Sequence, residues 1–112
     1  MEFEICDREL KKIFLDKRAL VHAYGTEQAD LILMRLAEIY AVDNFEILKK
    51  VPGPRLHPLT GNRKGQFSVD LLFPYRLIIE PANDNQSKKP DGTIVWKRVT
   101  KVRILEIANT HE

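Results

Sequence analysis

Apolar and polar residues alternate at the start of the chain and then recur with helical spacing. Phe3 and Ile5 alternate with charged residues, which predicts a strand over residues 2–6. Asp7 then suits a helix N-cap, and Gly25 suits the position that follows a helix. Four helical stretches are therefore expected, at residues 7–15, 17–24, 26–40 and 44–50.

The helix that begins at Thr26 has an apolar surface wider than one sheet needs. Its expected core face consists of Ala29, Leu33, Leu36, Ala37 and Tyr40. Four further apolar residues widen that face: Leu31, Ile32, Met34 and Ile39. Such a surface is either wrapped by a neighbouring helix or used to dock another chain.

Beyond Val-Pro-Gly-Pro at residues 51–54, the spacing changes to the period of two that strands show. Residues 66–72 place Phe67, Val69 and Leu71 on one face. A second strand follows at 75–80, then a polar loop at 81–92, and residues 93–108 predict a last long strand because they are rich in β-branched and aromatic residues.

The order of these elements predicts a fold of the α+β class. We expect a small single domain over residues 1–112 with the order β-α-α-β-β-β. Its antiparallel sheet would have about four strands, with the helices packed on one face. The other face would be partly free to form a site.

The composition is that of an ordinary globular protein, with 44% hydrophobic and 30% charged residues. Cys6 is the only cysteine, which excludes an intrachain disulfide and a thiolate zinc site. The first residues lack the basic start and apolar run of a signal peptide, and no stretch approaches the ~18 apolar residues of a membrane span. We therefore expect a cytoplasmic protein.

The net charge is only +2, but basic residues are concentrated in two stretches. Residues 49–64 contain five basic residues and no acid, and residues 97–103 contain four and no acid. These stretches either form a basic face for a polyanion or are ordinary solvated side chains of loops and strands.

One ordered segment carries a resemblance to a known family. It comprises Leu-His-Pro-Leu-Thr-Gly at 56–61, Asn-Arg-Lys-Gly at 62–65, Ser-Val at 68–69 and Tyr-Arg-Leu at 75–77. This set resembles the signature of HigB-like plasmid maintenance killer proteins, which are type II toxins of the RelE/ParE superfamily. The match is close over residues 56–81, and the order of elements around it agrees more loosely.

The resemblance implies a RelE/ParE-like fold and a ribosome-dependent endoribonuclease that cuts mRNA, arrests growth and uses no metal or other cofactor. The expected partners are the ribosome with its mRNA and a cognate antitoxin, typically a HigA-like helix-turn-helix repressor. Such cleavage requires activation of a 2′-hydroxyl, neutralisation of the phosphate and protonation of the leaving 5′-oxygen. Histidine suits the proton transfers, and arginine and lysine suit the phosphate.

The candidate site residues follow from this chemistry. The catalytic candidates are His57, His111 and Arg76. The candidates for RNA or phosphate binding are Arg55, Arg63, Lys64, Lys97 and Arg98. Each has a plainer interpretation, such as a turn histidine or a structural cation, and no metal ligand set is expected. Trp96 either covers a sheet edge or stacks on RNA.

The end of the chain departs from the family pattern. HigB-like nucleases commonly end their last strand with an Asp-Tyr-His type of sequence, whereas this chain has Asn109, Thr110 and His111. Thr110 cannot stack on a base, and Asn109 cannot act as a base. Two alternatives therefore stay open: a non-catalytic, ParE-like inhibitor of DNA gyrase, and a non-toxic partner-binding relative of the same fold.

Overall fold

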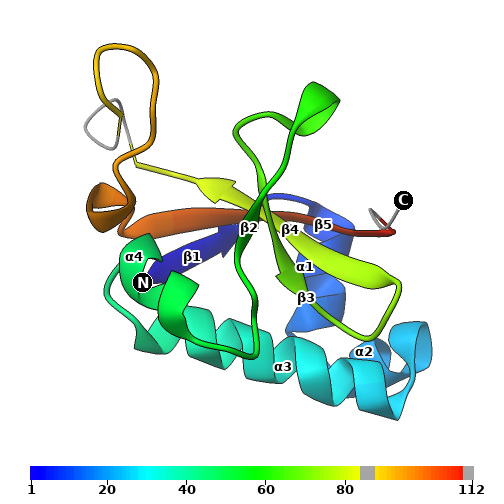
Figure 1. Cartoon of the computed structure of the whole chain (residues 1–112). Coiled ribbons are helices and arrows are strands. Elements are labelled where there is room, and N and C mark those ends of the chain that lie inside the picture. Colours follow the sequence, from blue (N-terminus) through cyan, green and yellow to red (C-terminus); the bar gives the residue numbers. More distant parts are fainter. Residues whose placement is uncertain (84–87, 110–112) are drawn as a thin grey trace.

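Four helices lie against one face of a five-stranded sheet in the computed structural model, which describes residues 1–83 and 88–109 (Figure 1). The strands are β1 (Glu2–Ile5), β2 (His57–Pro58), β3 (Phe67–Asp70), β4 (Tyr75–Pro81) and β5 (Lys101–Asn109). The helices are α1 (Arg8–Phe14), α2 (Lys17–Tyr24), α3 (Thr26–Ala41) and α4 (Phe45–Lys50). Two short 3-10 helices lie between strands, η1 (Gly61–Arg63) between β2 and β3 and η3 (Trp96–Arg98) between β4 and β5. The expected α+β class is confirmed.

Local capping explains where the helices begin. The Asp7 side chain accepts a hydrogen bond from the backbone N–H of Leu10 at 2.9 Å, which starts α1. Asn44 caps α4 in the same way. Gly25 has a φ of 83°, in the region that favours glycine, and it separates α2 from α3. All four predicted helices are therefore present, with ends that differ by a few residues.

The sheet is mixed, which corrects the expected antiparallel sheet of about four strands. Among the described residues, the strand order is β1-β5-β4-β3-β2. β1 pairs in parallel with β5, so that Ile5 lies opposite Ile104, while the other strand pairs are antiparallel. The extra strand, β2, is a two-residue edge strand whose His57 lies opposite Ser68. A strand of two residues has no periodicity from which it could be predicted.

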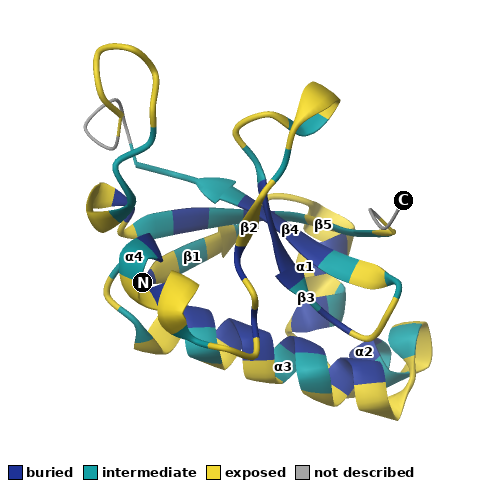
Figure 2. Cartoon of the chain, in the orientation of Figure 1, coloured by how far each residue is buried: buried dark blue, intermediate teal, exposed yellow. Residues whose placement is uncertain are grey.

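The core lies between α3 and the sheet, and it corrects the face of α3 that we expected to be buried. Ala37 and Tyr40 are exposed, as is Met34. Figure 2 shows α3 with buried and exposed residues on different sides of the helix. The buried stripe keeps Ala29 and Leu36 of the expected face and is completed by Ile32 and Ile39. This stripe buries two isoleucines in place of the small Ala37, which removes more apolar area from water. α2 packs beside α3 and covers part of the remaining apolar surface of α3.

Residues 93–100 do not extend the last strand, so the predicted strand over residues 93–108 is too long. Trp96 begins η3, and its ring packs edge-on against the core residue Phe67 with the ring centroids 5.2 Å apart. The Asn83 side chain accepts a hydrogen bond from the Lys101 N–H at 3.1 Å, where β5 begins. Aromatic packing and this hydrogen bond hold the segment away from the extended conformation that its residue types favour.

Candidate functional site

The face of the sheet opposite the helices carries a row of side chains from four neighbouring strands. His57 lies beside Ser68, Ser68 beside Ile78, and Ile78 beside Glu106. Cross-strand partners of this kind share one face of a sheet. Ile78 is fully buried, yet it is the one buried apolar residue of the described chain that does not join the core cluster. The row therefore lies on the face away from α3, which we call the open face, and His57 is exposed there.

The next row on the open face pairs an acid with a base. Asp70 lies opposite Arg76, and the Arg76 Nε is 3.4 Å from the Asp70 Oδ1. Arg55 approaches the same carboxylate from the segment before β2, with its Nη1 3.6 Å from Oδ2. His57 and Asp70 are diagonal neighbours on paired strands, for which the Cα atoms are roughly 7–8 Å apart. We call His57, Arg55, Asp70 and Arg76 the open-face cluster.

The segment that leads into β2 is fixed to the end of β3 by its main chain. Pro54 accepts a hydrogen bond from the Asp70 N–H at 2.8 Å. Arg55, the next residue, has a φ of 48°, which non-glycine residues adopt only where the surrounding structure holds them. The Val-Pro-Gly-Pro segment thus brings Arg55 and His57 to the acid at the end of β3.

Arg35 of α3 holds Asp70 from the helical side. Its side chain is buried, its Nε donates to the Asp70 carbonyl oxygen at 2.7 Å, and its Nη1 donates to the Glu38 carboxylate at 2.7 Å. A Cβ at Gly53 would lie 2.9 Å from the Arg35 Nη1. Only glycine therefore lets the chain pass there without displacing the Arg35 side chain. The Asp70 main chain is therefore anchored twice, which leaves its carboxylate to orient the two arginines.

Arg63 crosses the open face from the turn between β2 and β3. Its Nη1 donates to Gln66 at 3.1 Å and lies 3.4 Å from the Glu106 carboxylate. Because Glu106 belongs to β5, the Arg63 side chain reaches across β3 and β4 to that strand. This part of the open face carries three arginines and two carboxylates, so its net charge is only one positive unit: Arg55, Arg63 and Arg76 with Asp70 and Glu106.

The other predicted residues are not brought to this cluster. Lys64 is exposed and lines a separate cleft beside Phe67. Lys97 and Arg98 lie on η3 beside α4, where the Lys97 Nζ is 3.9 Å from a Glu46 carboxylate oxygen. His111 lies outside the described residues.

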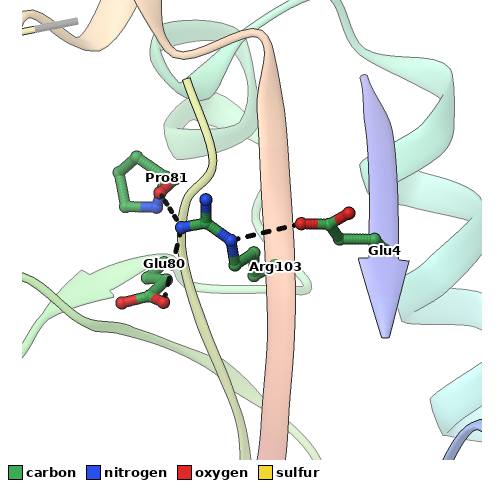
Figure 3. A network of polar contacts seen from close by, with 4 residues as sticks. All are labelled: Glu4, Glu80, Pro81 and Arg103. Carbon is green, nitrogen blue, oxygen red and sulfur yellow. Dashed lines mark hydrogen bonds and ion pairs between the residues drawn. The ribbon is translucent and has the colours of Figure 1, made fainter. Parts of the chain in front are cut away.

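Arg103, from the second basic stretch, has a structural role in the sheet (Figure 3). Its Nε donates to the Glu4 carboxylate of β1 at 3.2 Å, and its Nη1 lies 3.6 Å from the Glu80 carboxylate of β4. Nη1 also donates to the Pro81 carbonyl at 3.4 Å. The guanidinium thereby links β5 to both neighbouring strands, and its charge is balanced by two acids. Arg103 is therefore used within the sheet.

The acids of the open face, Asp70 and Glu106, and the anchor Arg35 were not predicted from the sequence. Period-two alternation already separates Ser68 and Asp70 from Phe67 and Val69, so those two polar residues could have been assigned to the face of Arg76. The Ser68 hydroxyl is buried and makes no hydrogen bond within the described part of the chain. No sequence pattern indicates this burial, because Ser68 shares its face with the polar residues Gln66 and Asp70. These two neighbours are only partly buried.

The described chain has no cluster of candidate metal ligands, and three of its titratable groups have shifted pKa values. No group of three or more His, Cys, Asp or Glu residues within residues 1–83 and 88–109 is placed to hold a metal ion. Burial raises the pKa of the Tyr24 phenol and, together with the Glu4 carboxylate, that of the Cys6 thiol. Hydrogen bonds from Thr93 lower the pKa of the Asp91 carboxyl. All three groups lie away from the open-face cluster.

No protein-family model matches the chain, and a search of curated proteins gives no significant match. In the described part of the chain, no helix has both the length and the apolar character needed to cross a membrane.

Proposed function

We propose that this chain is the toxin of a type II toxin–antitoxin module and cleaves mRNA on the ribosome without a metal ion. The observation that supports this function best is the open-face cluster. It gathers an exposed histidine and two arginines from two separate segments, the approach to β2 and the strand β4, on the face that the helices leave uncovered. The HigB-like motif at residues 56–81 gives independent support, because it contains both His57 and Arg76.

Each member of the cluster has a defined role in this reaction. Arg76 and Arg55 bind the phosphate, and the Asp70 carboxylate holds both guanidinium groups in position. The 2′-oxygen attacks the adjacent phosphorus as the bond from phosphorus to the 5′-oxygen breaks. His57 gives its proton to that leaving oxygen. General acid catalysis of this kind raises the reaction rate by a factor of ~10²–10⁴. The 2′-hydroxyl proton goes to His111 in this proposal.

The proposed target determines the partners and the compartment. A protein that acts on translating ribosomes works in the cytoplasm, and its cell needs an antitoxin that keeps it inactive. We propose a HigA-like helix-turn-helix antitoxin that masks the open face. Blocking this face would remove His57 and both arginines from contact with RNA at once.

Inhibition of DNA gyrase by a ParE-like mode of binding is the second candidate. The observation in its favour is a group of exposed apolar side chains at the turn between β3 and β4: Leu72, Phe73 and Tyr75. A contiguous exposed apolar patch can mark a protein-binding surface. A gyrase inhibitor would need this turn and would not need His57.

The two candidates make opposite predictions for transcripts. Purified protein is incubated with translating ribosomes, and the 5′-ends of the mRNA are mapped, alongside a supercoiling assay with gyrase. We expect new mRNA ends within coding regions and unchanged supercoiling. Intact mRNA together with stalled gyrase would replace the nuclease proposal by the second candidate.

A further inference from the structure

A cleft of about 410 Å³ lies between the loop that joins β2 to β3 and the segment that precedes β5. Both segments rise on the side of the sheet away from α3 (Figure 1). The apolar wall of the cleft is formed by Leu59, Phe67, Ile94 and Trp96. The volume falls within the range of about 300–1,000 Å³ that is usual for small-molecule sites.

The aromatic wall of the cleft is held rigidly from behind. The Trp96 ring packs against Phe67 and Phe45, with ring centroids 5.2 and 5.9 Å away. The Lys49 ammonium lies 4.9 Å from the centroid of the same ring. Trp96 nevertheless remains partly exposed and lines the cleft. The ring is therefore both fixed in position and accessible to a ligand.

The rim of the cleft is positively charged. Lys64 and Lys88 stand on its two sides, and the described residues that line it include no acid. The nearby Asp91 carboxylate accepts a hydrogen bond from the Thr93 N–H at 2.8 Å. An apolar aromatic wall between two ammonium groups fits a flat ring that is flanked by anions, which is the chemistry of a base in a nucleic acid strand.

We propose that this cleft binds one base of single-stranded RNA, with its flanking phosphates at Lys64 and Lys88. This inference rests on the proposed function for the identity of the nucleic acid. The cleft lies next to the edge strand β2, because it is lined by Pro58, which directly follows His57 in that strand. The base in the cleft would fix the position of the strand relative to His57.

Trp96 is the only tryptophan in the chain, so its fluorescence reports on this cleft alone. The wild-type protein is titrated with a short single-stranded RNA and with an oligonucleotide of equal length whose riboses lack bases. We expect the RNA to quench Trp96 and the abasic strand to bind about tenfold more weakly, without quenching. Equal affinity for both strands, or RNA binding that leaves the fluorescence unchanged, would overturn the inference.

Two matched variants locate the base. Thr93→Phe fills the cleft and should weaken RNA binding about tenfold, whereas Thr60→Phe, an exposed residue outside the cleft, should not. Lys64→Gln should reduce the salt dependence of binding while quenching at saturation is retained. Unchanged binding by Thr93→Phe, or equal losses in both phenylalanine variants, would contradict the cleft.

The test of the base-binding cleft can fail or succeed separately from the test of the proposed nuclease function. Mapping of mRNA ends on ribosomes is carried out on the same protein samples. Quenching by RNA without cleavage would retain the base-binding cleft and remove the nuclease. Cleavage by a protein whose Trp96 does not respond to RNA would retain the nuclease and remove the cleft.

Discussion

The Asp70 carboxylate lies 3.4 Å from the Nε of Arg76 across β3 and β4, and this pair fixes the direction of the guanidinium on the open face. The same carboxylate is 3.6 Å from the Arg55 guanidinium. Both arginines are thus oriented before any substrate arrives, because the Asp70 main chain is anchored by Pro54 and Arg35. Orientation of this kind is a substantial part of catalysis when the chemistry is phosphate binding and proton transfer.

Removing the Asp70 charge should therefore lower activity more than stability. Asp70→Asn keeps both main-chain hydrogen bonds and releases the arginines. We expect mRNA cleavage to slow by about ten- to a hundredfold. The thermal midpoint should fall by only a few degrees, because partly exposed ion pairs contribute about 0–1 kcal/mol. The control is Glu46→Gln, which breaks the Lys97 ion pair beside α4 and should cleave normally.

Arg76 itself should be required for toxicity. Arg76→Ala removes the phosphate contact, and we expect expression of this variant not to arrest growth. Its thermal midpoint should stay within a few degrees of the wild type. Arg18→Ala, on an exposed position of α2, is the matched control and should arrest growth fully. Growth arrest by a folded Arg76→Ala protein would exclude Arg76 from the site.

Arg35 should act on stability. Arg35→Met leaves the Asp70 carbonyl and the Glu38 carboxylate without their buried donor, so the free energy of unfolding should fall by about 1–3 kcal/mol. Lys12→Met breaks only the exposed pair with Glu9 and should change that free energy by less than about 0.5 kcal/mol. Denaturant titration of the two variants measures the difference. Equal losses would mean that Arg35 does not anchor the end of β3.

The Cys6 thiol should react slowly at neutral pH. Burial and the Glu4 carboxylate both raise its pKa, so less of it is thiolate at a given pH. The inflection of its reaction rate with a thiol reagent should therefore lie at higher pH in the folded protein than in denaturant. Glu4→Gln should move that inflection to lower pH, because it removes a negative charge and releases Arg103 from its ion pair. An unchanged profile would show that Glu4 does not act on Cys6.

The helices and the central hairpin could be predicted because their signals are local. Asp7 and Asn44 cap helices within four residues of their own positions, and Phe67 and Val69 alternate with polar residues. The parallel pairing of β1 with β5 could not be predicted, because it joins segments about 100 residues apart. The length of β5 depends on the contact of Trp96 with core aromatic rings, which no local pattern records.

The candidate site could be predicted only in part, for a similar reason. His57, Arg55 and Arg76 were identified from residue type and motif, and the structure brings them to one cluster. Asp70 was missed because its role depends on strand register and on a turn that returns Arg55 to it. Lys97 was assigned by charge alone, and it lies instead beside Glu46 of α4.

The most direct test is the cleavage rate of His57→Gln on translating ribosomes. Glutamine keeps a polar side chain but cannot transfer a proton near neutral pH, so the rate should fall by about a hundredfold or more while ribosome affinity stays the same. His22→Gln changes an exposed histidine of α2 and should cleave at the wild-type rate. If wild-type protein cuts mRNA and His57→Gln cuts it equally fast, the open-face cluster is not the catalytic site.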